Sequence, residues 1–188
     1  MKTSNFLYFF IFFPYIGIKL FPSDIQPYAL IVGLVLIISS KKLSLKTSHK
    51  ILLIPLLISL IDVIFNLGII VLGIRSFSGY LSFTVLNIVL FNLSKTSEFP
   101  KKLFSYSLYA WVIVGIIQLF FHKEFFSFMI PNFRFGDARG VLSFSPEPSY
   151  LGLTGFYFLI INMEYLNDKK LSFLSILITS SSKVIIPG

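Results

Sequence analysis

The feature that most constrains this chain is a series of seven apolar segments separated by short polar connections. Each is close to the roughly 20 residues that an α-helix needs to cross a hydrocarbon layer about 30 Å thick. We place the segments at residues 5–21, 25–40, 51–74, 79–94, 103–121, 149–166 and 171–186. A backbone in lipid has to satisfy its own hydrogen bonds. The prediction is therefore an all-α, polytopic transmembrane helical bundle of about seven spans, with six also allowed by the segment boundaries.

The composition excludes an ordinary water-soluble domain. Of the 188 residues, 55% are apolar and only 13% are charged. Too few polar side chains remain to cover a water-facing surface, so membrane lipids are the expected surroundings. There are no cysteines, which removes disulfides and thiolate metal sites. The two histidines, His49 and His122, are expected on opposite sides of the membrane, so neither a metal site nor a cofactor is predicted.

The net charge of +8 is better explained by membrane topology than by nucleic acid. A nucleic-acid surface gathers basic residues on one folded face, whereas here they lie between apolar runs. Cytoplasmic loops of membrane proteins retain Lys and Arg. With a cytoplasmic N-terminus, ten of the sixteen basic residues fall inside: Lys2, Lys41, Lys42, Lys46, Lys50, Lys95, Lys101, Lys102, Lys169 and Lys170. We therefore expect a multi-pass protein with its N-terminus in the cytoplasm and no nucleic-acid partner.

The longest connection, residues 122–148, is predicted to be an outer loop that carries the candidate site. Pro148 biases Glu147 towards an extended conformation and suits the first turn of a helix. Glu147 would then face the positive end of a helix dipole, where it either stabilises the helix start or takes a catalytic or ligand-ordering role. Small residues at three-residue spacing follow and predict a face for close helix packing: Ser149, Gly152 and Gly155.

The arginines point to an anionic ligand on the outer side. The chain uses Lys thirteen times but Arg only three times, and Arg75, Arg134 and Arg139 all fall in predicted outer loops. The guanidinium group presents a rigid fork of donors that suits bidentate phosphate binding. The alternative is that each arginine pairs with Asp137, with Glu147 or with lipid headgroups.

Two polar residues are predicted within the membrane. Asp62 lies near the middle of the segment 51–74, and Asn66 lies one turn further on the same face. A charge at that depth costs about 3 kcal/mol on insertion scales, so Asp62 should not face lipid. Either it is protonated and hydrogen-bonded to another helix, or it lines a polar cavity. The second possibility supports a transporter or a flippase for lipid-linked sugars.

One stretch resembles a known family. Arg139-Gly140 precedes Glu147-Pro148-Ser149 with Gly152, and a further apolar segment rich in Ser and Thr near its end, 179–182, follows. This arrangement is similar to the O-antigen and capsule polymerases of bacterial envelopes, within the wider O-antigen ligase and polymerase superfamily. The resemblance implies a glycosyltransferase of the plasma (inner) membrane that polymerises undecaprenyl-diphosphate-linked oligosaccharide repeat units at its outer face. It also allows a chain-length regulator as a partner.

The resemblance implies roles for the same residues. Arg139, with Arg134 and Arg75, would bind the diphosphate, and Glu147 or secondarily Asp137 would act as the catalytic base; Glu147 could instead orient Arg139. No metal or cofactor is needed, because arginines can neutralise the leaving group. Family members are longer, with a second large outer loop, so this sequence is expected to be an N-terminal fragment. A noncatalytic, truncated membrane subunit is therefore a further alternative.

Overall fold

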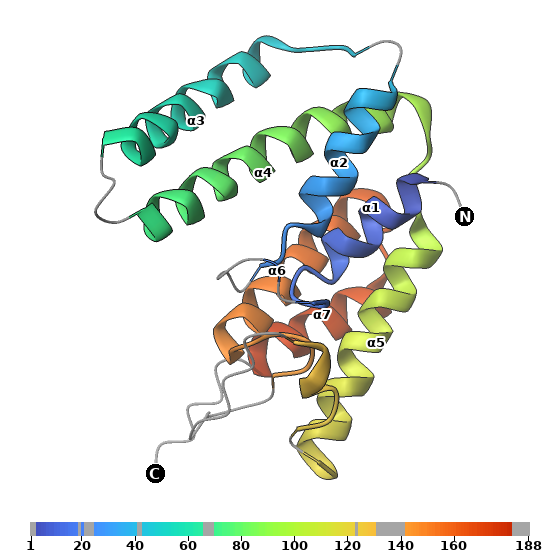
Figure 1. Ribbon diagram of the computed structural model, residues 1–188. Helices are drawn as coiled ribbons and strands as arrows, with labels where there is room; N and C mark the ends of the chain where they lie inside the picture. Colours follow the sequence, from blue (N-terminus) through green and yellow to red (C-terminus); the bar gives the residue numbers. More distant parts are fainter. Residues whose placement is uncertain are drawn as a thin grey trace. The chain divides into compact units, whose positions relative to one another are not determined.

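The computed structural model describes residues 3–18, 20, 25–40, 43–65, 70–122, 124–130 and 142–181. Those residues form seven α-helices and one short 3₁₀ helix, and no strand occurs among them (Figure 1). The predicted all-α class is thus confirmed for the described part of the chain. The chain divides into two compact units. No linker divides the sequence, which predicts a single membrane domain over 1–188; this stays a prediction.

Unit 1 comprises Met1–Ile11, Leu20–Ser23 and Pro27–Phe99. Its helices are α1 (Thr3–Phe12, of which the last residue belongs to unit 2), α2 (Tyr28–Ser39), α3 (Thr47–Phe65) and α4 (Ile70–Thr96). The core forms where α1, α2 and α4 meet, around Leu7, Leu30, Val85 and Val89. Figure 1 shows α3 beside α4, running in the opposite direction. This hairpin is tight, because a Cβ added to Gly73 would lie 3.1 Å from Cγ2 of Val63.

Unit 2 comprises Phe12–Lys19, Asp24–Gln26 and Pro100–Gly188. Its elements are α5 (Lys101–Phe120), the 3₁₀ helix η2 (Ser127–Met129), α6 (Pro148–Tyr165) and α7 (Lys169–Ser181). Both α5 and α6 pack against α7. The core is aromatic and surrounds the fully buried Trp111, with Phe12, Phe13, Phe104, Phe144 and Phe158 around it.

Three helices have the length and apolar composition needed to cross a membrane. They are Thr47–Phe65, Gly73–Thr96 and Lys101–Phe120, while α2 is apolar but shorter. Many apolar side chains of α3 are exposed, including Leu57, Ile58 and Ile61. Burying such a surface in lipid rather than leaving it in water is favourable by about 25 cal/mol per Å². The length and composition of these three helices indicate a membrane protein.

The predicted segment 5–21 is wrong as a single helix. Helix α1 has 10 residues and ends at Phe12, so it reaches only about 15 Å. Pro14 cannot continue a helix that begins before it without breaking a backbone hydrogen bond, and Gly17 has a φ of 134°, outside the helical region. The chain consequently leaves the helix well before the end of the apolar run.

The predicted boundary between the segments 51–74 and 79–94 is also wrong. Helix α3 ends at Phe65, and α4 already begins at Ile70. The apolar composition is nearly continuous across this region, so hydropathy alone does not reveal where the chain turns. The contact between the two helices near Gly73 fixes the reversal.

The later segments agree better with the prediction. The segment 103–121 corresponds to α5 and the segment 149–166 to α6, each within two residues at either end. The segment predicted at 171–186 overlaps α7, which begins at Lys169 and whose described part ends at Ser181. Its remaining residues lie outside the described part of the chain.

The turn between α6 and α7 is held by a buried amide. Asn162 Nδ2 donates to the carbonyl oxygen of Asp168 at 2.8 Å and to Ser172 Oγ at 2.7 Å. Asn167 adopts a left-handed φ of 52°, and its N–H donates to the Asn162 carbonyl oxygen. Asp168 Oδ1 then accepts a hydrogen bond from the Lys170 N–H at 2.8 Å, which caps the start of α7. These bonds fix the two helices as an antiparallel pair.

The predicted close-packing face on α6 is confirmed in part. Gly152 and Gly155 are buried, whereas Ser149 is exposed. A Cβ on Gly155 would lie 2.7 Å from the backbone nitrogen of Thr179 and 2.9 Å from Cγ2 of Ile178. Only glycine fits at this point, because the obstructing atom belongs to the backbone of α7.

We predict that Gly155→Ala destabilises the protein. The methyl group must push α6 away from α7, and overpacking of this kind costs about 1–3 kcal/mol. The measurement is thermal unfolding of the purified protein in detergent. Gly79→Ala in α4 is the matched control, because nothing lies within 4 Å of its added Cβ. Alanine is the better helix former, so Gly79→Ala should unfold at an equal or higher temperature. Equal behaviour of the two variants would contradict the predicted contact.

Candidate functional site at the start of helix α6

The candidate site is built on the turn that leads into α6. The Ser145 N–H donates to the Leu142 carbonyl oxygen at 2.9 Å and closes the turn, while Ser143 adopts a left-handed φ of 51°. Glu147 follows in an extended conformation (φ −147°, ψ 153°) as the N-cap residue, and Pro148 occupies the first turn of the helix. The predicted extended conformation of Glu147 and the predicted place of Pro148 in the first turn of a helix are both confirmed.

A buried glutamine ties this turn to α5. Gln118 Nε2 donates to the carbonyl oxygens of Ser143 at 3.0 Å and Phe125 at 2.8 Å. Its Oε1 accepts the Ser143 N–H at 2.6 Å, and the Ser143 hydroxyl donates to the Trp111 carbonyl oxygen at 2.7 Å. A buried polar group left unpaired costs about 1–3 kcal/mol. The four bonds therefore offset the strain of a non-glycine residue at positive φ and hold the turn in one conformation.

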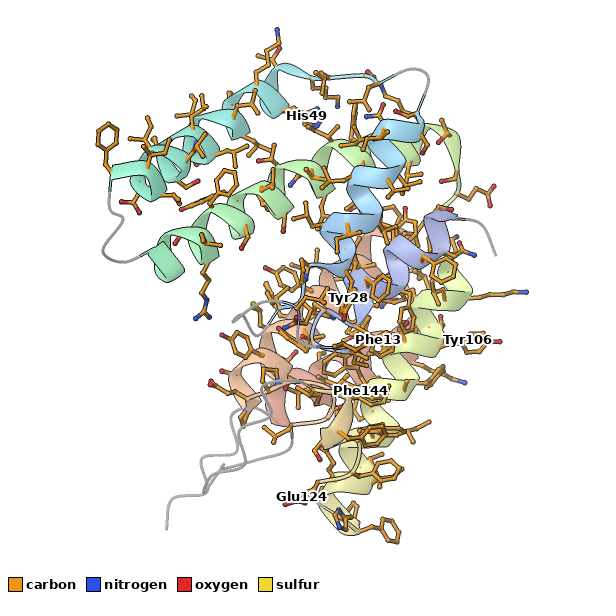
Figure 2. The ribbon with its side chains drawn as sticks, in the orientation of Figure 1. Phe13, Tyr28, His49, Tyr106, Glu124 and Phe144 are labelled. Atoms are coloured by element: carbon orange, nitrogen blue, oxygen red, sulfur yellow. The ribbon has the colours of Figure 1, made fainter. Side chains whose placement is uncertain are left out.

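The same turn is packed against aromatic rings. The Trp111 indole N–H donates to the Phe12 carbonyl oxygen at 3.0 Å. The Trp111 ring contacts Phe144 edge-on, with centroids 5.4 Å apart, and stacks with Phe13 at 6.1 Å. Figure 2 labels Phe13 and Phe144, whose rings meet edge-to-face at 5.3 Å. Aromatic pairs of this geometry add about 0.5–1.5 kcal/mol each beyond their burial. The backbone before Glu147 is thus anchored on both sides.

The Glu147 carboxylate is half-buried and does not cap the helix. No side-chain hydrogen bond joins it to the first N–H groups of α6. The Ser149 hydroxyl lies 3.5 Å from Glu147 Oε2, at the limit of hydrogen-bonding distance. A contribution of this carboxylate to the helix start is therefore electrostatic, through the helix dipole. Hydrogen bonds hold the backbone turn that precedes Glu147. The Glu147 carboxylate lies at the N-terminus of α6.

The structure describes three of the predicted site residues. Glu147 belongs to unit 2, whereas Asp62 and Arg75 belong to unit 1. Arg75 was predicted in a loop; this is wrong, because it lies within α4, about one and a half turns from the start at Ile70. The other predicted site residues lie outside the described part of the chain: Asn66, Arg134, Asp137 and Arg139.

Asp62 does not lie where it was predicted. It was expected near the middle of a span, but α3 ends at Phe65 and places Asp62 in the last turn of the helix. The residue is exposed in unit 1. A carboxylate near the end of a membrane helix can reach the polar interface, which costs far less than a charge at the centre. The argument for a polar path at membrane depth is correspondingly weaker.

Sequence reasoning missed the residues that position Glu147. Gln118, Trp111 and Ser143 form the buried network, yet none was among the predicted site residues. The sequence could have singled out Gln118 as a hydrogen-bonding residue, because an amide inside the apolar segment 103–121 is costly in lipid unless it is hydrogen-bonded. Its partners could not be inferred, since they are backbone groups 7 and 25 residues away in sequence.

Within the part of the chain that the structure describes, no three His, Asp or Glu side chains gather as a metal site would require. Comparison with known proteins yields no relative: no family model matches the chain, and neither a curated protein nor a solved structure shows a significant match. The functional assignment therefore depends on the residues and on their geometry.

We predict that Gln118→Leu loosens the turn before Glu147. The substitution preserves approximate volume but leaves the Ser143 N–H and the carbonyl oxygens of Ser143 and Phe125 without their partner. Each unpaired group costs about 1–3 kcal/mol, so a large fall in thermal stability in detergent is expected. Ser105→Ala, at a partly buried position of the same helix where the hydroxyl donates to the Lys101 carbonyl oxygen, is the control and should change stability little. A stability loss no larger than that of the control would show that the network contributes nothing.

Proposed function

We propose that this chain belongs to a multi-pass protein of the bacterial plasma membrane that polymerises undecaprenyl-diphosphate-linked oligosaccharide repeat units. The observation that carries the proposal is the carboxylate of Glu147 at the start of α6. It stands on a backbone held by buried hydrogen bonds, without being used as a helix cap. It also lies within the Glu-Pro-Ser sequence that resembles the O-antigen and capsule polymerases.

A rigid carboxylate suits the proposed reaction. The hydroxyl group of the acceptor sugar attacks the anomeric carbon of the growing chain, and Glu147 takes up the hydroxyl proton. The bond between that carbon and the diphosphate oxygen breaks, so the lipid diphosphate leaves with the electron pair. Holding the base in one geometry lowers the entropic cost of the attack. Asp137 is the second candidate for the base.

The leaving diphosphate requires positive charge. Arg139 is eight residues before Glu147 in the sequence and is the first candidate donor, followed by Arg134 and Arg75. Guanidinium groups bind phosphate oxygens in pairs and remain protonated at any physiological pH. Arg75 is the weakest of the three candidates, because it lies within α4 rather than in a loop.

The proposed topology has a cytoplasmic N-terminus and places residues 122–148 on the outer side. The exposed aromatic side chains at the end of α5 and in η2 suit a position at the lipid interface, where a polyprenyl carrier would approach: Phe120, Phe121 and Phe128. The alternative of a transporter or flippase loses support, since Asp62 lies in the last turn of α3. The alternative of a noncatalytic subunit stays a prediction.

We predict that Glu147→Gln and Arg139→Ala each abolish long-chain surface polysaccharide in cells that depend on this protein for it. Removing a general base lowers turnover by roughly 10²–10⁴-fold. The measurement is the length distribution of the polysaccharide on a gel, with protein abundance measured in parallel. Glu164→Gln is the matched control, because Glu164 is an exposed glutamate near the other end of the same helix. Arg139→Lys separates a need for charge from a need for the forked guanidinium geometry.

Normal polysaccharide ladders in both variants, at normal protein abundance, would refute the site assignment. Loss of protein in Glu147→Gln but not in Glu164→Gln would instead assign Glu147 a structural role at the helix start.

We predict that η2 is accessible from outside the cell. The chain has no native cysteine, so single substitutions can be labelled without background. Phe128 is 83% exposed, and the Phe128→Cys variant should react with a membrane-impermeant maleimide in intact cells. Thr96→Cys, at an exposed position where α4 ends, should react only after the cells are opened. The opposite pattern would place the loop in the cytoplasm and eliminate a polymerase of external glycans.

A further inference from the structure

Two lysines share one aromatic ring where α3 begins and α4 ends. Lys46 Nζ lies 4.4 Å from the centroid of the Phe91 ring, and Lys95 Nζ lies 4.1 Å from it. Cation–π contacts at these distances stabilise each ammonium group at the ring face. Both contacts are within unit 1. We refer to Ser44, Lys46, Phe91 and Lys95 as the lysine–phenylalanine site.

Hydrogen bonds between distant parts of the chain hold this site together. The Ser44 N–H donates to Asn92 Oδ1 at 2.9 Å, and Asn92 Nδ2 donates back to the Ser44 carbonyl oxygen at 3.1 Å. Lys95 Nζ donates to Ser44 Oγ at 2.8 Å. The segment before α3 is therefore fastened to α4 at the position where the two ammonium groups approach the ring.

A buried histidine supports the same arrangement. His49 Nδ1 accepts the Lys46 N–H at 3.1 Å, in the way that the third residue of a helix pairs with the N-cap residue in a capping box. Its ring meets that of Phe91 at a centroid distance of 5.1 Å and an angle of 70°. In Figure 2, His49 lies on the side of α3 that faces α4. Histidine thus positions the backbone of Lys46 against Phe91.

The site carries positive charge that the described residues do not neutralise. Over residues 43–65 and 70–99 of unit 1, neither Lys46 nor Lys95 forms an ion pair with a carboxylate. Two like charges held at one ring repel each other, and an anion bound to the ammonium groups would lower that repulsion. The pair therefore resembles a preformed receptor for one phosphate group.

The surroundings of the site favour a lipid as the source of that phosphate. The site lies at the ends of Thr47–Phe65 and Gly73–Thr96, two of the helices that can cross a membrane. Leu43 and Leu45 flank Ser44 and are 39% and 56% exposed, so apolar side chains stand beside the charged ones. Such a mixture suits the boundary where acyl chains meet headgroups, because lysine side chains extend along apolar surface towards the charges.

We propose that the lysine–phenylalanine site binds the phosphate of an anionic phospholipid in the leaflet at which α3 begins. The two ammonium groups and the Ser44 hydroxyl contact the phosphate oxygens, while Leu43 and Leu45 contact the acyl chains. The proposal requires a membrane protein but does not depend on the polymerase function.

The test uses the intact chain in nanodiscs of phosphatidylcholine, into which phosphatidylglycerol is titrated. Retained lipids are counted by native mass spectrometry, and thermal unfolding is followed at each lipid ratio. Each lysine near a membrane surface contributes about fivefold to anionic lipid binding, so Lys46→Gln with Lys95→Gln should weaken it by roughly 25-fold. The unfolding temperature of this double variant should no longer rise with added phosphatidylglycerol.

Lys101→Gln with Lys102→Gln is the matched control. These lysines are exposed and begin α5, another helix able to cross a membrane, but no ring among the described residues makes a cation–π contact with both of them. Phe91→Leu keeps both charges and most of the apolar volume, and it should weaken binding by an intermediate factor. Equal losses of phosphatidylglycerol binding in the two double variants would show that general surface charge causes the effect, and this would overturn the proposal. Saturation of the site by inorganic phosphate alone would also overturn it, because the ligand would then be a soluble anion.

Discussion

The shortage of polar surface in this chain makes every buried polar group dependent on a partner within the protein. Gln118 illustrates the constraint, since its amide pairs with the N–H and carbonyl oxygen of Ser143 and with the carbonyl oxygen of Phe125. Gln118 is buried within the protein, where water cannot replace such a partner, so the bonds restrict which backbone conformations are allowed. These hydrogen bonds favour the conformation that the turn before α6 adopts.

The same constraint explains the hydroxyl groups in the apolar helices. Many of them donate to a carbonyl oxygen three or four residues earlier in their own helix, as in Ser59, Ser82, Thr84, Ser175 and Thr179. A serine or threonine on an apolar helix is thereby satisfied without a ligand. Ser107 differs, because its buried hydroxyl has no partner among the described residues. Hydroxyl groups in these helices are consequently weak indicators of function.

The charged groups for which functions are proposed lie at the ends of helices. Glu147 stands where α6 begins, and the lysine–phenylalanine site lies where α3 begins and α4 ends. At a helix end a charge can interact with the helix dipole and with the polar interface of the membrane. Both proposed binding functions therefore use short connecting segments that hydrogen bonds hold rigidly against a long apolar helix.

The sequence by itself indicated that lipid surrounds the chain. It also determined the all-α class and the local conformation at Glu147 and Pro148. Hydropathy and proline geometry are local properties, so α5 and α6 could be placed within two residues. Only the tertiary structure decided that the chain reverses after Phe65, because nearly continuous apolar composition conceals a turn that the contact of Gly73 with Val63 defines. The partners of Gln118 and the meeting of Lys46 with Lys95 at Phe91 likewise join residues far apart in sequence. Pairings of that kind depend on how helices pack, which no local pattern reports.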